Sequence, residues 1–275
     1  MLVPMPVGSA IDARRKNRWL TKFASYWSNP TRGAIEDWLD QFSKEDRDVA
    51  ARMLDAVLFI DQAHIYIKFR TLLAALEGWS ADPQQRVGRW AFVPFSGSAG
   101  ESGDTMTHWF RSATGMTQKK YNDLFCYRSE ILAKEFGPED TIVLIDDFAG
   151  TGTQASDAWR DYFSELVADG PRVILMLVCA TSAAASKIAE STDMSLHAGH
   201  VLSEPDNFFS NACVQFSQDE KRKALAYCER ASRSDPKGYG NCGLLLVLAH
   251  KCPNNSLPVL HSQARKWAPL FPRRG

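Results

Sequence analysis

The chain has no surplus of charge of either sign, because its 32 lysines and arginines balance 32 aspartates and glutamates over 275 residues. A balanced charge argues against a broad cationic surface of the kind that binds nucleic acid or an anionic membrane. A local basic cluster occurs near the amino terminus, at Arg14, Arg15, Lys16 and Arg18. We expect this cluster to be a solvated helix face, which leaves direct nucleic-acid binding as the weakest functional alternative.

The sequence also lacks long apolar runs and clustered cysteines. No apolar run reaches the roughly 20 residues that a membrane-spanning helix needs, and the first residues lack the charged start and long apolar core of a signal peptide. The six cysteines are scattered without a Cys-x-x-Cys pair, which argues against zinc and favours reduced thiols. We therefore expect a cytoplasmic protein without a membrane span.

The most informative stretch is 141–154. A β-branched-rich apolar run over 141–145 leads into two adjacent carboxylates, Asp146 and Asp147, and a small Gly/Thr loop over 148–154 follows. A buried parallel strand would deliver the carboxylates to its carboxyl end, where ligands of open α/β sheets bind. Carboxylates accept hydrogen bonds from hydroxyl groups, and such a loop before a helix can surround a phosphate with N–H groups. The order favours a phosphorylated sugar over a purely structural turn, which any Rossmann-like sheet could also contain.

This stretch resembles the ribose-5-phosphate motif of the type I phosphoribosyltransferases. The resemblance implies a glycosyltransferase that uses phosphoribosyl pyrophosphate with Mg²⁺ as cofactor, and it implies that Asp146 and Asp147 are catalytic residues facing the ribose 2′ and 3′ hydroxyls. It also assigns the 5′-phosphate to Gly150, Thr151, Gly152, Thr153 and Gln154. One departure concerns Gly150, because several purine-salvage members carry an acidic general base inside this loop. The loop therefore lacks the acidic side chain that would handle a purine base by that route.

A second glycine- and serine-rich loop follows the apolar run 90–95, which predicts a strand. In the family, the loop after an early strand holds the diphosphate of the sugar donor. Its counterpart here is the stretch Ser96, Gly97, Ser98, Ala99 and Gly100. Glycines in such a loop let the backbone approach the diphosphate closely. The alternative is a plain connection to the helix predicted through residues 106–110.

Between the two loops, the family often has a mobile flap whose basic and aromatic residues cover the diphosphate. Lys119, Lys120 and Arg128 are the candidates for that role, with ordinary solvated side chains as the alternative. A helix is predicted from near Asn122 to Phe136, where Gly137-Pro138 ends it.

The acceptor would meet a variable hood that superfamily members assemble partly from terminal segments. Asn254 and Asn255 follow a predicted strand, 244–249, and their amides could recognise an acceptor through paired donors and acceptors. An ordinary Pro-Asn-Asn turn is the alternative.

Helical periodicity over 11–79 and the break at Asp82-Pro83 predict two domains, a helical domain over 1–82 and an α/β domain over 83–275 with a carboxyl-terminal hood and tail. Apolar runs at 173–179 and 194–201, separated by a helical pattern, give the βαβ rhythm of a doubly wound, mostly parallel sheet. His197 and His200 would point to opposite faces of the last strand, so no metal site is predicted there. We expect the Pro-rich apolar tail to dock on the body.

The stretches Ile-Asp-Asp-Phe-Ala-Gly-Thr-Gly, Cys-Pro-Asn-Asn-Ser-Leu-Pro and Trp-Ala-Pro-Leu-Phe-Pro-Arg together resemble the phosphoribosyltransferase-like effector proteins of bacterial conflict systems. This narrower resemblance implies a role in anti-phage defence, with partner proteins encoded nearby that dock on the helical domain. The competing interpretation is a non-catalytic module that retains the phosphosugar pocket to sense a nucleotide or to bind a partner.

Overall fold

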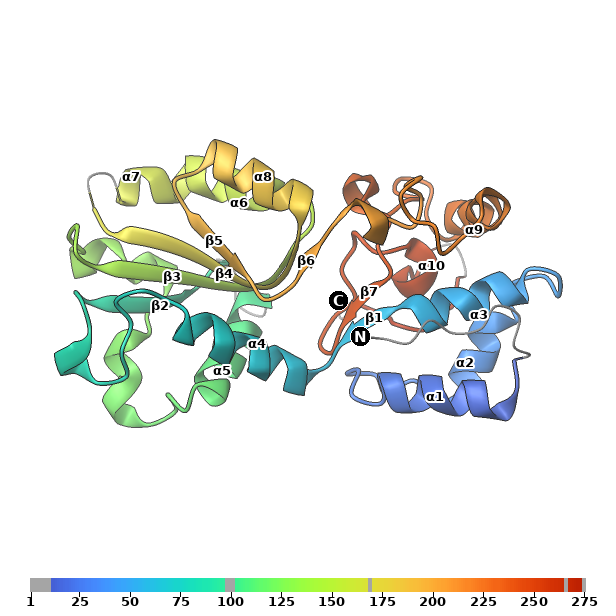
Figure 1. Cartoon of the computed structure of the whole chain (residues 1–275), viewed down its shortest axis with the longest axis horizontal. Coiled ribbons are helices and arrows are strands. Elements are labelled where there is room, and N and C mark those ends of the chain that lie inside the picture. Colours follow the sequence, from blue (N-terminus) through green and yellow to red (C-terminus); the bar gives the residue numbers. More distant parts are fainter. Residues whose placement is uncertain (1–10, 97–101, 168–169, 265–266, 274–275) are drawn as a thin grey trace. The chain divides into compact units, whose positions relative to one another are not determined.

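The computed structural model describes residues 11–96, 102–167, 170–264 and 267–273. The chain forms two compact units (Figure 1). One is continuous, Ala63–Ser203, and the other combines Met1–Gln62 with Glu204–Gly275. This division differs from the domains expected at 1–82 and 83–275, because the carboxyl-terminal segment belongs with the amino-terminal helices. We call the two units the sheet unit and the two-segment unit.

A parallel sheet forms the centre of the sheet unit. Its strand order is β2-β3-β4-β5, with β6 also beside β4, and every pairing is parallel. The strands are β2 (Trp90–Pro94), β3 (Thr141–Ala149), β4 (Arg172–Thr181), β5 (Ser195–Ala198) and β6 (Val201–Leu202). Residues 141–147 and 173–181 are buried throughout, which explains why their sequences are apolar on both faces.

Helices cover both faces of this sheet, as predicted for a doubly wound fold (Figure 1). On one side lie α4 (Gln62–Ala74) and α5 (Ser102–Ala113), and Phe92 meets Phe110 there with ring centroids 4.8 Å apart. On the other side lie α6 (Thr153–Ala158), α7 (Ser164–Leu166) and α8 (Ser182–Ser191), and Phe95 stacks on Phe163 at 6.2 Å. A π-helical segment, Trp159–Phe163, joins α6 to α7.

The helix predicted from Asn122 to Phe136 is wrong. This stretch instead contains three short 3₁₀ turns, η2 (Lys119–Leu124), η3 (Arg128–Glu130) and η4 (Leu132–Lys134). The backbone between η2 and η3 is extended, and Phe125 forms a parallel bridge with Phe92 at the edge of β2. Because the open edge of β2 offers hydrogen-bonding groups, this pairing replaces helix formation there.

The two-segment unit takes helices and strands from both ends of the sequence. The first segment supplies α1 (Ala13–Phe23), α2 (Arg32–Leu39), α3 (Arg47–Ala56) and β1 (Leu58–Ile60), and the second supplies α9 (Gln218–Ala231), β7 (Leu246–Leu248) and α10 (Pro258–His261). β1 pairs in parallel with β7 in a separate two-stranded sheet. Residues 58–60 were predicted as helix, but pairing with β7 gives them a strand conformation.

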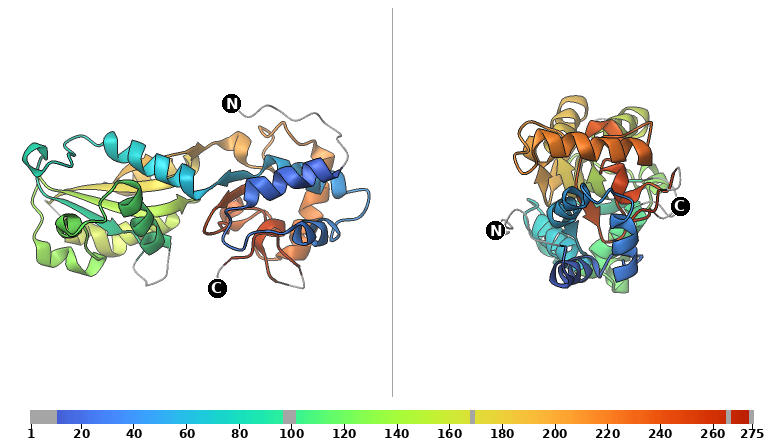
Figure 2. Two further views of the ribbon diagram at one scale, coloured as in Figure 1. Left: turned by 90° about the horizontal axis from the view of Figure 1, so that it is seen from below. Right: turned by 90° about the vertical axis from the view of Figure 1, so that its right-hand side faces the viewer.

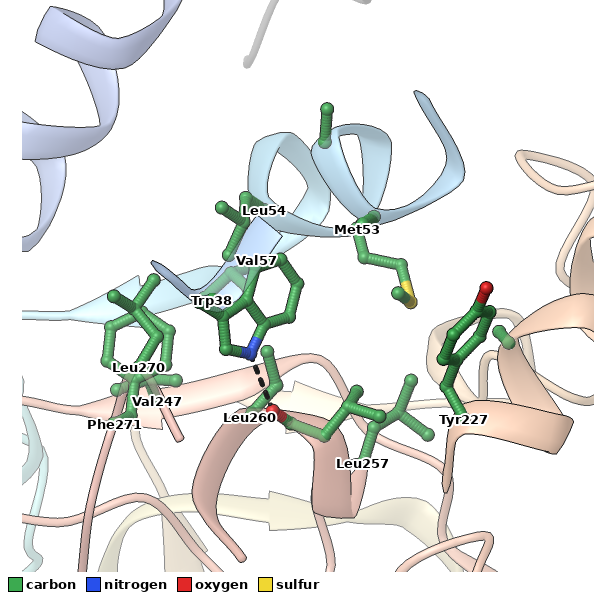
Figure 3. Close-up of a cluster of buried hydrophobic side chains, with 14 of the residues drawn as sticks. Trp38, Met53, Leu54, Val57, Tyr227, Val247, Leu257, Leu260, Leu270 and Phe271 are labelled. Carbon is green, nitrogen blue, oxygen red and sulfur yellow. Dashed lines mark hydrogen bonds between the residues drawn. The ribbon is translucent and has the colours of Figure 1, made fainter. Parts of the chain in front are cut away.

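Both segments contribute to one apolar core (Figure 3). Side chains of the first segment, such as Trp38 and Met53, lie among Leu257, Leu260 and Phe271 of the second. The views in Figure 2 likewise show blue and orange-red chain within this one unit. The indole N–H of Trp38 donates to the Val259 carbonyl oxygen at 2.7 Å. Neither segment could bury its apolar side chains in this core without the other.

The carboxyl-terminal tail docks on this core, as predicted. Phe271 is fully buried and makes edge-to-face contacts with Phe23 and Tyr26, with ring centroids 4.8 and 5.3 Å apart.

The basic cluster near the amino terminus is not a uniformly solvated face. Arg15 is only 2 % exposed, and its guanidinium pairs with Asp55 at 2.7 Å while lying over the ring of Trp19. Arg14 and Arg18 are exposed, as expected.

Among the residues that the structure describes, no helix has both the length and the apolar character to cross a bilayer.

Candidate functional site

The acidic pair lies near the carboxyl end of β3, two residues before the strand ends at Ala149. Asp146 and Asp147 are 4 % and 7 % exposed. The Asp147 backbone N–H donates to Asp146 Oδ1 at 2.9 Å, and the Asp146 carboxyl also forms hydrogen bonds with the side chains of Ser102 and Asp147. Ser102 is the first residue of α5, so one end of this helix contacts the acidic pair.

Burial, together with the charge of the neighbouring Asp147, raises the pKa of Asp146 well above its ordinary range. Two adjacent buried carboxyls therefore share a proton more readily than exposed ones. A protonated carboxyl donates a hydrogen bond while an ionised one accepts. The pair is thus chemically suited to two neighbouring hydroxyl groups, such as those of a ribose.

The stretch 150–154 leads from β3 into α6, whose first two residues are Thr153 and Gln154. The carbonyl oxygen of Gly150 accepts a hydrogen bond from Thr181 Oγ1 at 2.6 Å. Gly152 has a φ of +72°, and a Cβ at this position would lie 3.0 Å from the Ala184 carbonyl oxygen. Both the left-handed conformation and this close packing favour glycine at position 152.

The side chains of this loop form a small hydrogen-bonded group. The Thr153 backbone N–H donates to Thr151 Oγ1 at 3.3 Å, and the two threonine hydroxyls are 3.2 Å apart. Gln154 is exposed at the end of the loop. The five residues predicted to hold a phosphate are therefore contiguous with the acidic pair within one compact unit.

Lys187 was not anticipated from the sequence. It lies on α8, and its Nζ donates to Thr153 Oγ1 at 2.7 Å. It is the single basic residue of α8. The signal that could have identified it is topological, because the helix after the next parallel strand packs beside the loop and the helix of the preceding βα unit.

The loop proposed to hold the diphosphate falls largely outside the described residues, which is where Gly97, Ser98, Ala99 and Gly100 lie. Ser96 is buried, and its Oγ accepts a hydrogen bond from the Gly103 backbone N–H at 2.9 Å. Ser96 thus satisfies one donor at the beginning of α5. Its role toward a diphosphate stays a prediction.

The three flap candidates have different surroundings. Lys119 and Lys120 are exposed on η2, and Lys120 lies over its neighbour Tyr121. The Arg128 guanidinium lies 3.7 Å from the ring centroid of Tyr162, and the Tyr162 hydroxyl donates to the Arg128 carbonyl oxygen at 2.9 Å. Arg128 is therefore attached to the α6–α7 side of the unit, and the flap role of all three stays a prediction.

A hollow of about 550 Å³ lies beside α5, between that helix and residues 122–130. Asp104, His108 and Arg111 line it from α5, and Tyr127 lines it from the 3₁₀ region. At about 100° per residue, these α5 positions lie on the side of the helix away from Ser102. The hollow is therefore separate from the acidic pair.

The acceptor candidates lie in the two-segment unit, whereas the acidic pair lies in the sheet unit. Asn255 is buried, and its Nδ2 donates to the Tyr239 carbonyl oxygen at 3.0 Å and to Cys242 Sγ at 3.4 Å. Asn254 is exposed, and its carbonyl oxygen accepts from the Tyr239 backbone N–H at 2.8 Å. The side-chain amide of Asn255 thus holds a turn, and only that of Asn254 faces solvent.

In the described ranges, no cluster of three or more His, Cys, Asp and Glu residues could hold a metal ion. His197 lies in β5, and burial, with a smaller contribution from Arg172, lowers its pKa. Mg²⁺ commonly binds one or two carboxylates together with substrate phosphates and waters. Asp146 and Asp147 fit that mode when a phosphate ligand supplies the remaining oxygens.

A family model, PRTase-CE, matches residues 35–273 of the chain. The chain belongs to this phosphoribosyltransferase-like family. The match contains the acidic pair, both loops and most of the two-segment unit. That unit is therefore part of the PRTase-CE architecture and not an unrelated appendage. A comparison with curated proteins gives no match.

Proposed function

We propose that this PRTase-CE protein binds a ribose-5-phosphate donor, phosphoribosyl pyrophosphate with Mg²⁺, and transfers the phosphoribosyl group. The observation that carries this proposal is the buried, hydrogen-bonded pair Asp146 and Asp147 near the end of a strand of a parallel sheet, with a hydrogen-bonded Gly/Thr loop immediately after that strand. Membership of a phosphoribosyltransferase-like family over residues 35–273 supports it. A Gly/Thr loop alone would be weak support, so the proposal depends on the combination of the loop with the acidic pair.

Each part of the site has a distinct task in this proposal. Asp146 and Asp147 hold the two ribose hydroxyls, one carboxyl donating and the other accepting. Their negative charge also favours the positive charge that develops on the sugar ring as pyrophosphate leaves. The loop over 150–154 fixes the 5′-phosphate, which restricts the position of the sugar. Mg²⁺, bound by phosphate oxygens and the acidic pair, would supply neutralisation of charge on the diphosphate.

A second candidate function rests on Gly150. This position carries no acidic side chain, and its carbonyl oxygen is occupied by Thr181. A general base for a purine acceptor is therefore absent from the described loop. A non-catalytic module that senses a nucleotide or binds a protein partner would use the phosphosugar pocket and would not need that base.

The biological setting that we propose is bacterial anti-phage defence, with protein partners from the same operon docking on the helical region. The proposal rests on the resemblance of three sequence stretches to effectors of conflict systems. Phage challenge of cells that express the operon tests it. Loss of protection on replacing Asp146 and Asp147 with Asn would support an effector that uses the acidic pair, and unchanged protection would contradict it.

Calorimetric titration of the purified protein tests the biochemical proposal. The ligands are phosphoribosyl pyrophosphate with and without Mg²⁺, ribose 5-phosphate, and common nucleotides. Saturable, Mg²⁺-dependent binding of the diphosphate sugar, weakened in the D146N/D147N variant, is the expected result. Binding of nucleotides alone would favour the sensor. Unchanged affinity in the folded double variant would refute the assignment of the acidic pair.

A further inference from the structure

Helix α8 makes three contacts with the loop over 150–154, from positions spaced three residues apart. Thr181, its N-cap, donates to the Gly150 carbonyl oxygen, Ala184 packs against Gly152, and Lys187 donates to Thr153. Residues at this spacing lie on one side of a helix. One side of the first turns of α8 therefore contacts the loop, and Lys187 is one of the contacting residues.

The Lys187 ammonium is held at the loop by an uncharged group. Lys187 is exposed, and within the described part of the chain it forms no ion pair. The acidic residue of α6, Asp157, is paired with Arg160 at 3.0 Å. An ammonium has three donors, and its hydrogen bond to Thr153 Oγ1 uses one of them. The remaining donors and the full charge are available to an anion.

The loop itself offers no positive charge, since residues 150–154 are Gly, Thr, Gly, Thr and Gln. A sugar phosphate carries about −1.5 to −2 charges at neutral pH, as phosphorylated side chains do. Backbone N–H groups alone would hold this charge less strongly than N–H groups assisted by a cation. A cation that reaches the first turn of α6 from α8 supplies the positive charge that the loop lacks.

We propose that Lys187 is the charge-recognition residue of the phosphate site, so that its ammonium pairs with the 5′-phosphate and selects the dianionic form. This inference rests on the proposed function, because it presumes that the loop binds a sugar phosphate. It goes beyond that function by assigning specificity for phosphate charge to a side chain outside the loop. A purely structural role, in which Lys187 only fastens Thr153, is the alternative that the experiment must distinguish.

The decisive variant is Lys187→Gln, because Gln keeps a donor for Thr153 Oγ1 and removes the charge. Lys187→Arg restores the charge, and Lys44→Gln removes a charge from an exposed lysine of the other unit. Affinity for ribose 5-phosphate is measured by calorimetry from pH 5.5 to 7.5, across the range where the phosphate takes its second charge. Unfolding temperatures verify that each variant is folded.

We expect K187Q to bind roughly 10- to 100-fold more weakly at pH 7.5, the size of a charge-assisted hydrogen bond. The rise in affinity with pH should be smaller in K187Q than in the wild type and K44Q, and K187R should restore most of it. Unchanged affinity in K187Q, or weaker binding with the same pH dependence, would overturn the charge role while leaving the proposed function intact. Failure of the wild-type protein to bind would refute both.

Discussion

Replacing Asp146 with Asn should stabilise the protein while it impairs ribose binding. Asp146 is 4 % exposed, and burial followed by the charge of Asp147 raises its pKa well above the ordinary range. Asn has nearly the same shape and keeps one carbonyl oxygen, which can still accept from the Asp147 backbone N–H. The substitution therefore removes an ionisable group without opening a cavity.

The pH dependence of this effect has a definite sign. Below the unfolded-state pKa, about 3.9, Asp146 is protonated in both states and costs no stability. As the pH rises above that value, the unfolded chain releases the proton and the folded chain keeps it, so the free energy of unfolding falls until the folded-state pKa is reached. The maximum slope is about 1.4 kcal/mol per pH unit. D146N escapes this loss, so its advantage grows with pH.

The magnitude follows from this linkage, since each pH unit between the unfolded-state and folded-state pKa values of Asp146 costs about 1.4 kcal/mol. For a protein of this size, each kcal/mol corresponds to a change in Tm of roughly 2–4 °C. Thermal unfolding of the wild type and D146N at pH 5 and pH 8 provides the assay. The increase in Tm should be larger at pH 8.

Asp140 offers a matched control of opposite sign, also near β3. It is 7 % exposed, and although burial opposes ionisation, hydrogen bonds from Arg89 and the Gly137 N–H lower its pKa. Its ionised form contributes stability above the unfolded-state pKa, and this contribution disappears as the pH falls through the folded-state pKa. D140N should therefore lower Tm at pH 8 and have less effect near pH 3. If D146N lowered Tm as D140N does, or shifted it equally at pH 5 and pH 8, the argument from burial would be refuted.

Two further substitutions test the loop and the core. Gly152→Ala should reduce both Tm and affinity for ribose 5-phosphate, because its Cβ would lie 3.0 Å from the Ala184 carbonyl oxygen. The control Gly115→Ala has a similar positive φ and nothing within 4 Å of its Cβ, so it should cost only the roughly 1 kcal/mol of backbone strain. Equal losses of Tm in the two variants would contradict the packing argument. Phe271→Ala should lower the free energy of unfolding, measured with denaturant, by about 3–5 kcal/mol, since this ring is fully buried. Val214→Ala, at an 88 % exposed position, should change that free energy little. A small loss in Phe271→Ala would mean that the tail is not docked.

The sheet unit was predictable where the sequence pattern is local. The runs at 90–95 and 173–179 are apolar on both faces, which strands buried in a parallel sheet require, and both are strands. In the two-segment unit, the capping box of Ser217 with Glu220 three residues later is a comparable local signal at the beginning of α9. The acidic pair and the Gly/Thr loop were found because the strand, carboxylates and loop are contiguous in sequence.

The errors have a non-local cause in each case. Residues 58–60 were predicted as helix because the residues that pair with them in a strand, 246–248, are far away in sequence. The stretch 122–136 was predicted as helix because the extended conformation near Phe125 depends on the open edge of β2. Lys187 went unnoticed because its contact with Thr153 depends on how two βα units pack side by side. Local periodicity carries no information about any of these partners.

The same non-local packing changes where the chain can be divided. A cut at residue 82 would separate α1–α3 from the segment that supplies Leu260 and Phe271 to their core, and it would leave β7 without β1. A division at 63 and 203 leaves the acidic pair, its loop, α5 and α8 in one continuous piece. All of the contacts that define the candidate phosphosugar site lie within that piece. The sheet unit alone therefore suffices for a test of the phosphosugar site, while the acceptor role of Asn254 and Asn255, in the two-segment unit, stays a separate prediction.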